Sequence, residues 1–354
     1  MTACLSDKNN IQLTRTPSLR IAGLLAGVML SVLPVQGFAD ETTRQAAVPE
    51  MINYGKHEAV AGFIDRMVEQ HGFDRPYLQG LFDDASKQQS IIDAISRPAE
   101  KMLTWGEYRK IFLTEKRISG GKKFMEEHKD TLERAEKEFG VPKEIIAAII
   151  GVETSYGQIM GRYRVVDALS TLSFDYPARS KFFSKELEEL LLLSREQKFD
   201  PMALKGSYAG AMGYGQFIPS SYRAYAVDFD GDDTADILNN VEDAIGSVAN
   251  YFKRHGWKTD EPVAFPVDVK EPVPAELLPE NRKPAQKLAD VAKVGVKAPD
   301  SIAKDAPVRL VRYENTDAIE HWLVTHNFYV ITRYNHSDRY AMAVYQLSRE
   351  LAGA

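Results

Sequence analysis

The chain has 354 residues, of which 44% are apolar and 27% charged, a balance typical of a globular protein with one or two domains. Its 44 basic and 50 acidic residues give a net charge of −6, which argues against a nucleic-acid partner because such partners select a basic face. The single cysteine excludes an intrachain disulfide and a cysteine-based metal site.

Residues 1–39 have the pattern of a cleaved signal peptide. Basic residues precede an apolar run over 21–35, and Gly37-Phe38-Ala39, with small residues at its two ends, provides a cleavage site. The run is shorter than an ordinary membrane span, although an uncleaved anchor is the alternative. Cys4 lies before the run, so cleavage of the signal peptide would remove it. Export of a chain without cysteine suits a bacterial periplasm.

Periodic apolar residues predict an N-terminal helical domain over 40–140. Its helices are expected at 60–71, 76–85, 90–95, 105–114 and 118–139. A core over 141–257 follows, with one helix that carries Glu153 and others at 167–172, 181–196 and 241–255.

The composition shifts toward Pro, Lys and Val after residue 257. A small, mostly β insertion over 258–335, with a flexible middle near 270–300, is predicted from β-favouring runs at 263–269, 308–313 and 328–332. Residues 336–354 are predicted to form a helix that packs back on the core, because alone it is too short to be stable.

Glu153 lies on the apolar face of its predicted helix. Pro142 suits the first helical turn, and Ile149 and Ile150 lie one turn before Glu153 on the same face. Burial there would raise the pKa of the carboxyl group, because it disfavours the charged form. A carboxylic acid that keeps its proton near neutral pH can cleave a glycosidic bond. The alternative is a buried Glu paired with Arg or Lys.

A glycine-rich stretch over 206–221 is a second candidate for ligand binding. Its glycines let backbone approach a ligand closely, and hydroxyl and amide groups suited to a sugar come from Ser207, Tyr208, Tyr214 and Gln216. The stretch lacks the ending of a phosphate-binding loop. A tight crossing of two helices would also explain the small residues.

Carboxylates over 228–236 have the ligand spacing of an EF-hand-like calcium loop, at Asp228, Asp230, Asp232 and Asp236. The usual closing glutamate is absent, so the closing ligand would be Glu242 or Asp243. A solvated acidic turn is the alternative. The histidines lack metal-ligand spacing, so we expect no zinc site.

Four motifs resemble the membrane-bound lytic murein transglycosylase B family, namely residues 151–154, 207–217, 243–252 and 331–337. The resemblance implies a mainly α (α+β) fold with a lysozyme-like helical core, an additional helical domain and a small β insertion. It also implies an EF-hand-like loop that holds a structural calcium ion, with no organic cofactor. No Leu-x-x-Cys lipobox precedes the cleavage site, which favours a soluble, non-lipoprotein member of the family.

The resemblance implies roles for individual residues. Glu153 matches the single catalytic acid and base. The calcium loop matches Asp228, Asp230 and Asp232, to which our reading of the spacing adds Asp236 and Asp243. Substrate contacts are implied for Tyr108, Arg179, Ser207, Gln216, Tyr251, Tyr334 and Tyr340.

The implied activity is cleavage of the β-1,4 bond between N-acetylmuramic acid and N-acetylglucosamine, with formation of a 1,6-anhydro end. A lysozyme-type hydrolase would need a second carboxylate, for which Asp167 and Asp175 are candidates. A non-catalytic peptidoglycan-binding protein is the other alternative. The expected partners are peptidoglycan glycan strands and other cell-wall enzymes, and we expect a monomer.

Overall fold

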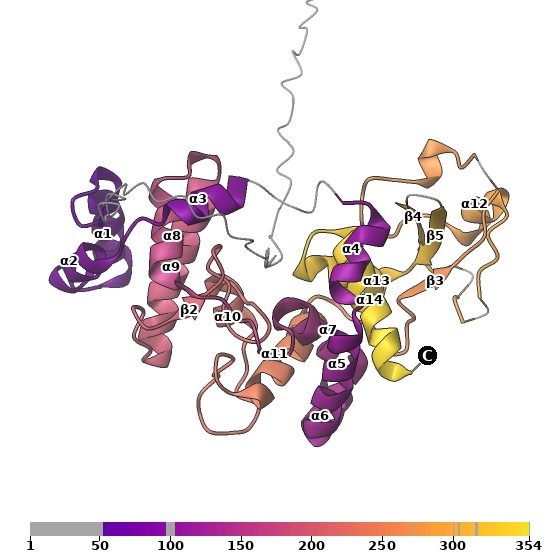
Figure 1. Cartoon of the computed structure of the whole chain (residues 1–354), viewed down its shortest axis with the longest axis horizontal. Helices are drawn as coiled ribbons and strands as arrows, with labels where there is room; N and C mark the ends of the chain where they lie inside the picture. The colour runs from indigo at the N-terminus through magenta and orange to yellow at the C-terminus, as the bar shows by residue number, and fades with distance from the viewer. Residues whose placement is uncertain are drawn as a thin grey trace, which may run out of the picture.

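The computed structural model describes residues 52–96, 103–270, 272–299, 301–303, 305–315 and 318–353. The predicted signal peptide therefore lies outside the described residues. The described chain is mainly helical, as predicted, with its α1 and α2 helices at one end and a small sheet at the other (Figure 1). None of the helices described is both long enough and apolar enough to cross a membrane.

The first three helices pack beside the middle of the chain. They are α1 (Glu58–His71), α2 (Arg75–Asp84) and α3 (Gln89–Ser96), and they lie next to α8 (Val165–Phe174) and α9 (Ser180–Gln197). The Arg66 guanidinium on α1 donates to the Ser184 hydroxyl on α9. Asp74 caps α2 by accepting the Tyr77 N–H, and a proline occupies the first turn.

The next three helices pack on the helices α7 (Lys143–Thr154), α11 (Val241–Arg254) and α14 (Asp338–Ala352), which follow later in the chain. They are α4 (Trp105–Phe112), α5 (Glu115–Glu127) and α6 (Lys129–Phe139). Our prediction of one helix over 118–139 was wrong, because the chain breaks at His128. The reason is tertiary: α5 packs mainly on α7, whereas α6 packs mainly on α11. The predicted domain boundary at residue 140 stays a prediction.

The centre of the molecule is built on α7. Residues 145–152 of this helix are all buried, and α14 packs along it. The short helix α10 (Pro219–Tyr225) joins α9 to α11. The two-residue strands β1 (Tyr163–Arg164) and β2 (Lys205–Gly206) pair antiparallel and place the glycine-rich loop that follows β2.

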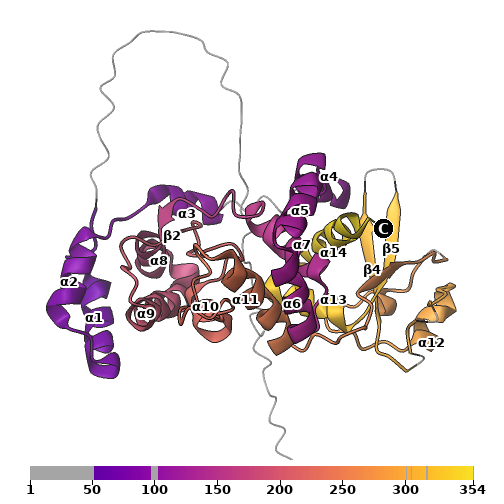
Figure 2. The ribbon, with the colours of Figure 1, turned by 90° about the horizontal axis from the view of Figure 1, so that it is seen from below.

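The C-terminal part contains an antiparallel sheet in the order β3-β5-β4, formed by β3 (Ala264–Pro266), β4 (Arg309–Glu314) and β5 (Ile319–Val324). The β4–β5 hairpin stands beside α14 (Figure 2). One face of the sheet packs on a small apolar cluster that includes Val291, on α12 (Leu288–Val291), and Leu310.

The β-favouring run at 328–332 does not form a strand, so that prediction was wrong. It lies in α13 (His326–Tyr334), where Phe328 and Ile331 are buried in the main core three residues apart. Burial on a helical face overrides the β propensity of the branched residues. The sheet instead contains strand β5, which we did not predict.

Candidate active site

Glu153 occupies the last turn of α7 and is half-buried, although its neighbours on both sides are buried. The helix ends because Ser155 adopts a left-handed conformation, with φ 50°. The Thr154 hydroxyl lies 2.9 Å from the carbonyl oxygen of Tyr214. This contact ties the end of α7 to the glycine-rich loop, so the predicted acid and the predicted ligand loop are neighbours.

Tyr340 holds the carboxyl group of Glu153. Its hydroxyl donates to Glu153 Oε1 at 2.5 Å, and the tyrosine is 2% exposed in the first turn of α14. Burial, and then the charge of Glu153, raise the pKa of Tyr340 well above its ordinary value. The phenol therefore keeps its proton near neutral pH and donates it in the hydrogen bond to Glu153.

Tyr334 has a similar environment at the end of α13. Its hydroxyl donates to the carbonyl oxygen of Gly215 at 2.5 Å. Burial, and then the charge of Glu153, raise its pKa well above the ordinary value. Tyr251 on α11 packs edge-on against Tyr334, with ring centroids 4.8 Å apart, and donates to the carbonyl oxygen of Arg333 at 2.6 Å.

Tyr108 reaches the same group from α4. It is 1% exposed, its helix packs against α14, and its electrostatic interaction with Tyr340 is among the causes that raise the pKa of Tyr340. The structure therefore brings four of the predicted tyrosines together with Glu153: Tyr108, Tyr251, Tyr334 and Tyr340. They come from four helices, of which α13 and α14 are consecutive and α4 and α11 are distant in the sequence.

Gln216 follows Gly215 and has a left-handed backbone, with φ 50°. Its Nε2 donates to the carbonyl oxygens of Gly213 at 3.0 Å and Met160 at 3.2 Å. Its Oε1 is buried and, among the described residues, finds no hydrogen-bond donor. A buried acceptor without a partner is costly, so this oxygen suits a hydroxyl or amide donor of a ligand. Gly213 is required because it has φ 71° and an added Cβ would meet Ile237.

Ser207 opens the loop and is buried. Its backbone N–H donates to the carbonyl oxygen of Ala211 at 2.8 Å, and its Oγ accepts from Ala211 N at 3.1 Å. Arg179 lies in the short helix η2 (Pro177–Arg179), with its guanidinium 4.3 Å from the centre of the Phe182 ring. Burial lowers its pKa. Contact of either residue with substrate stays a prediction.

The two candidate second carboxylates are engaged with segments that flank the N-terminal helices. Asp167 is buried, pairs with Arg164 at 2.8 Å and accepts the Ser86 N–H at 3.0 Å. Asp175 accepts from Lys87 and from the hydroxyl of Tyr54, each at 2.6 Å. Each carboxylate therefore has a structural role that occupies its oxygens.

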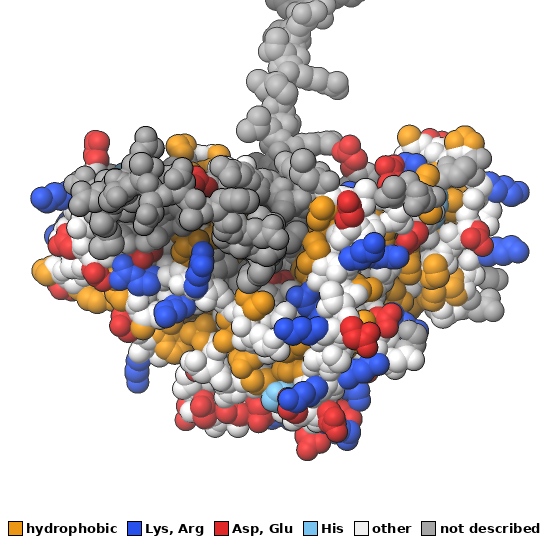
Figure 3. Space-filling view, in the orientation of Figure 1, with side chains coloured by type: hydrophobic (Ala, Val, Ile, Leu, Met, Phe, Trp, Pro, Cys, Tyr) orange, Lys and Arg blue, Asp and Glu red, His pale blue; other side chains and the backbone are white. Residues whose placement is uncertain are grey.

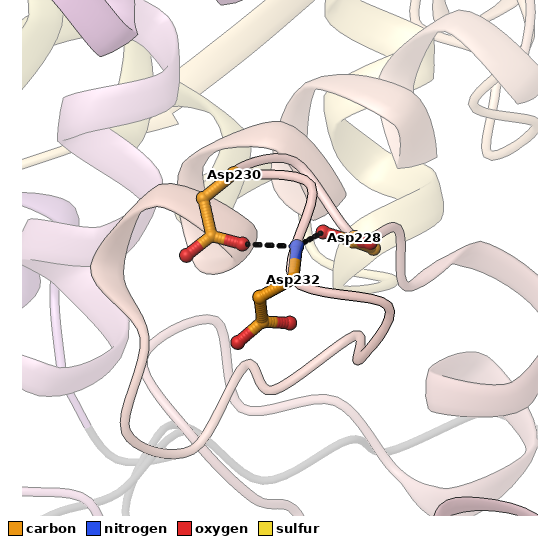
Figure 4. A group of neighbouring side chains, drawn as sticks. All are labelled: Asp228, Asp230 and Asp232. Atoms are coloured by element: carbon orange, nitrogen blue, oxygen red, sulfur yellow. Dashed lines mark hydrogen bonds between the residues drawn. The ribbon is translucent and has the colours of Figure 1, made fainter.

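The acidic loop lies between α10 and α11. Asp228, Asp230 and Asp232 bring a carboxylate oxygen each to within 4.8 Å of one another. Figure 4 shows the backbone nitrogen of Asp232 between the carboxylates of the other two, which accept from it at 3.2 and 3.1 Å. Figure 3 shows acidic side chains gathered along the lower edge of the molecule, where this loop lies.

Asp236 and Asp243 do not belong to this carboxylate cluster in the described chain. Asp236 accepts backbone N–H groups of Leu238 and Asn239 at 2.9 and 3.1 Å. Asp243 is fully buried and joins the two sides of the loop, because it accepts from Phe229 N at 2.6 Å and Asp236 N at 2.7 Å. Their roles as metal ligands stay predictions.

A cavity of about 1110 Å³ lies at the sheet and not at Glu153. It is lined by residues of β3, β4 and β5 and of the segment after β3, such as Asp268, Arg312 and Trp322. None of the predicted substrate-binding residues lines it.

Sequence analysis missed two residues that shape the end of α7. One is Thr154, which follows Glu153 directly. The other is Arg117 on α5, which donates to Ser155 Oγ at 2.9 Å and to the carbonyl oxygen of Ile111 at 2.7 Å. No local pattern marks Arg117, because its partner lies in another helical segment.

Comparisons with known proteins identify the family of this chain. The family model described as the transglycosylase SLT domain matches residues 55–349. Membrane-bound lytic murein transglycosylase B of Escherichia coli (strain K12) is 44% identical over 299 residues, which are 82% of this chain and 81% of that protein.

Two solved structures are also similar. The catenated lytic transglycosylase SltB1 from Pseudomonas aeruginosa is 51% identical, with a TM-score of 0.81 and coverage of 85% of this chain and 99% of that chain. The Escherichia coli lytic transglycosylase Slt35 in complex with calcium is 43% identical, with a TM-score of 0.77 and coverage of 85% and 93%. The chain therefore belongs to the transglycosylase SLT domain family, as a member of its membrane-bound lytic murein transglycosylase B group.

Proposed function

We propose that this protein is a peptidoglycan lytic transglycosylase, in which Glu153 serves first as acid and then as base. The observation that carries the proposal is the state of the carboxylates. Glu153 is half-buried at the end of a buried helix and accepts from a phenol that keeps its proton, whereas Asp167 and Asp175 are engaged elsewhere. A single carboxylic acid with a neutral neighbour suits a reaction that needs no second carboxylate.

In the first step Glu153 donates its proton to the oxygen of the β-1,4 bond between N-acetylmuramic acid and N-acetylglucosamine. Because Tyr340 donates to Oε1, the transferable proton belongs on Oε2. The bond from this oxygen to C1 breaks, and N-acetylglucosamine leaves with its new hydroxyl. The acetamido oxygen of the muramic acid stabilises the positive charge at C1 as a cyclic intermediate.

In the second step the Glu153 carboxylate accepts the proton of the C6 hydroxyl. The C6 oxygen attacks C1, the bond to the acetamido oxygen breaks, and a 1,6-anhydro ring forms. Glu153 regains its proton, so the cycle consumes no water. A lysozyme-type hydrolase would instead need a positioned carboxylate on the opposite face of the sugar.

The substrate-binding set is part of this proposal. Tyrosine rings offer apolar faces to sugar rings and polar tips to their hydroxyls. The buried Gln216 Oε1 supports a role as acceptor for a sugar donor group. Ser207 and Arg179 complete the proposed contacts with the glycan strand and its peptide.

We also propose that the acidic loop binds calcium. Three oxygen ligands within 4.8 Å of one another fit a hard cation, and the similar Slt35 was solved with calcium. Asp228, Asp230 and Asp232 would hold the ion, with Asp236 and Asp243 in support. The ion would neutralise the clustered negative charges of the loop, and its role would be structural. Export by the leader would place the monomeric enzyme in the periplasm, with glycan strands and other cell-wall enzymes as partners.

Mass analysis of muropeptides released from purified sacculi tests the function. We expect the wild type to release products with 1,6-anhydro ends, which are lighter by one water than products with free reducing ends. Glu153→Gln should abolish release, whereas Glu144→Gln, in the first turn of the same helix, should not. Free reducing ends would favour a hydrolase. No release by the wild type, or full release by Glu153→Gln, would refute the proposal.

A further inference from the structure

The position of Tyr340 depends on the first turn of α14, where it lies two residues after Asp338. The Ser337 hydroxyl caps this turn by accepting the Tyr340 N–H at 3.3 Å. A displacement of the turn would therefore move the phenol away from Glu153. The question is what holds the turn in place.

Two residues of strand β4 contact Asp338. The Arg309 Nη2 lies 2.7 Å from Asp338 Oδ1. The Tyr313 hydroxyl donates to the backbone oxygen of Asp338 at 2.9 Å. Arg282, in the loop before α12, is a more distant partner at 3.9 Å. The small sheet is thus joined by charge to the helix that carries Tyr340.

Arg309 is the unusual member of this group. It is 1% exposed, and its side chain lies inside the fold, where an isolated positive charge is costly. Its Nη1 donates to the carbonyl oxygen of Asn281 at 3.2 Å. The compensating interaction is the close charge–charge contact with the Asp338 carboxylate, which lacks hydrogen-bond geometry. A buried charge with this carboxylate as its nearest partner resists any movement that separates them.

We propose that Arg309 and Asp338 are positioning residues for the reaction of Glu153. Their ion pair fixes the first turn of α14 against β4, and this turn holds the Tyr340 hydroxyl on Glu153 Oε1. The small sheet, which supplies none of the predicted substrate contacts, then contributes to catalysis through this link. The inference rests on the proposed function.

The test compares kcat and KM on soluble glycan strands for Arg309→Met, for Asp338→Asn and for the double variant. Each should lower kcat by about 10- to 100-fold with little change in KM, because an error of about 1 Å in a catalytic group has an effect of that size. The double variant removes both charges, so it leaves no buried charge unpaired and guards against failure to fold. Arg309→Lys should restore part of kcat.

Arg312→Met is the matched control, since Arg312 lies on the same strand but is exposed and pairs with Glu314 at 2.6 Å. It should leave kcat unchanged. A cycle with Tyr340→Phe separates positioning from general damage, because Arg309→Met should have little further effect on kcat once the hydroxyl is gone.

Equal losses of kcat with and without the Tyr340 hydroxyl would overturn the inference, as would a folded double variant with wild-type kcat. These results leave the proposed function standing if Glu153→Gln is inactive. That function fails separately if the wild type forms no anhydro ends.

Discussion

Tyr340→Phe removes one oxygen atom and keeps the ring, so it isolates the hydrogen bond to Glu153. The bond is short, at 2.5 Å, and its donor is 2% exposed. A hydrogen bond to a charged group contributes about 1.5–3 kcal/mol, which corresponds to roughly 10- to 150-fold in rate if the bond orients the carboxyl group. We expect kcat to fall by this factor.

The same substitution should shift the pH–rate profile. The donated hydrogen bond favours the carboxylate form of Glu153, so its loss should let the acid keep its proton to higher pH. The alkaline limb of kcat/KM should therefore move upward. Tyr340 itself cannot be the source of that limb near neutrality, because burial and the Glu153 charge raise its pKa well above the ordinary value.

Release of anhydro-muropeptides, followed from acid to alkaline pH, measures both effects. Tyr345→Phe is the matched control, since Tyr345 lies on the same helix and donates to the carbonyl oxygen of Ala264 at 2.8 Å. It should cost about 1 kcal/mol of stability with no change in the profile. A folded Tyr340→Phe enzyme with wild-type kcat and an unmoved alkaline limb would refute the reasoning.

Three further predictions concern stability. Tyr156→Phe should leave the melting temperature unchanged or raise it, because the Tyr156 hydroxyl is buried without a hydrogen-bond partner among the described residues; a fall of several degrees would contradict this. Calcium at about a hundredfold excess over Kd should stabilise the fold by about 2.7 kcal/mol. Calorimetry should show that this stabilisation is lost in Asp230→Asn and kept in Asp233→Asn. Equal behaviour of the two variants would argue against the site. Burial raises the pKa of Tyr313 and Tyr334 well above 10, so the stability that these two phenols contribute should be constant below the unfolded pKa of about 10 and be lost at higher pH. Stability in urea that does not fall between neutral and strongly alkaline pH would contradict the assignment.

Local patterns in the sequence predicted most helices, because periodic apolar residues and caps act over a few neighbours. The family and the mainly α fold with a small β part are confirmed. The break at His128 and the helical state of residues 328–332 were not predictable in this way, since both depend on which distant helices supply the partners.

The candidate active site shows the same limit of prediction from local sequence patterns. The helical pattern identified Glu153 as a candidate, but its contact with Tyr340 spans 187 positions, and no local pattern predicts that the two residues meet. The ion pair of Arg309 with Asp338 has no sequence signal. A charged residue within a β-favouring run is usually expected at the surface, whereas Arg309 is buried.

The arrangement of phenols and carboxylates explains how one residue can serve as both acid and base. The tyrosines nearest Glu153 have pKa values raised by burial, so they donate hydrogen bonds without exchanging protons near neutral pH. The other candidate carboxylates, Asp167 and Asp175, are held by cationic partners near the N-terminal helices. Glu153 is then the group at this site that can release a proton and recover it. A reaction whose second step returns the proton from the substrate's own hydroxyl needs no other exchangeable group, and so the fold favours transglycosylation over hydrolysis.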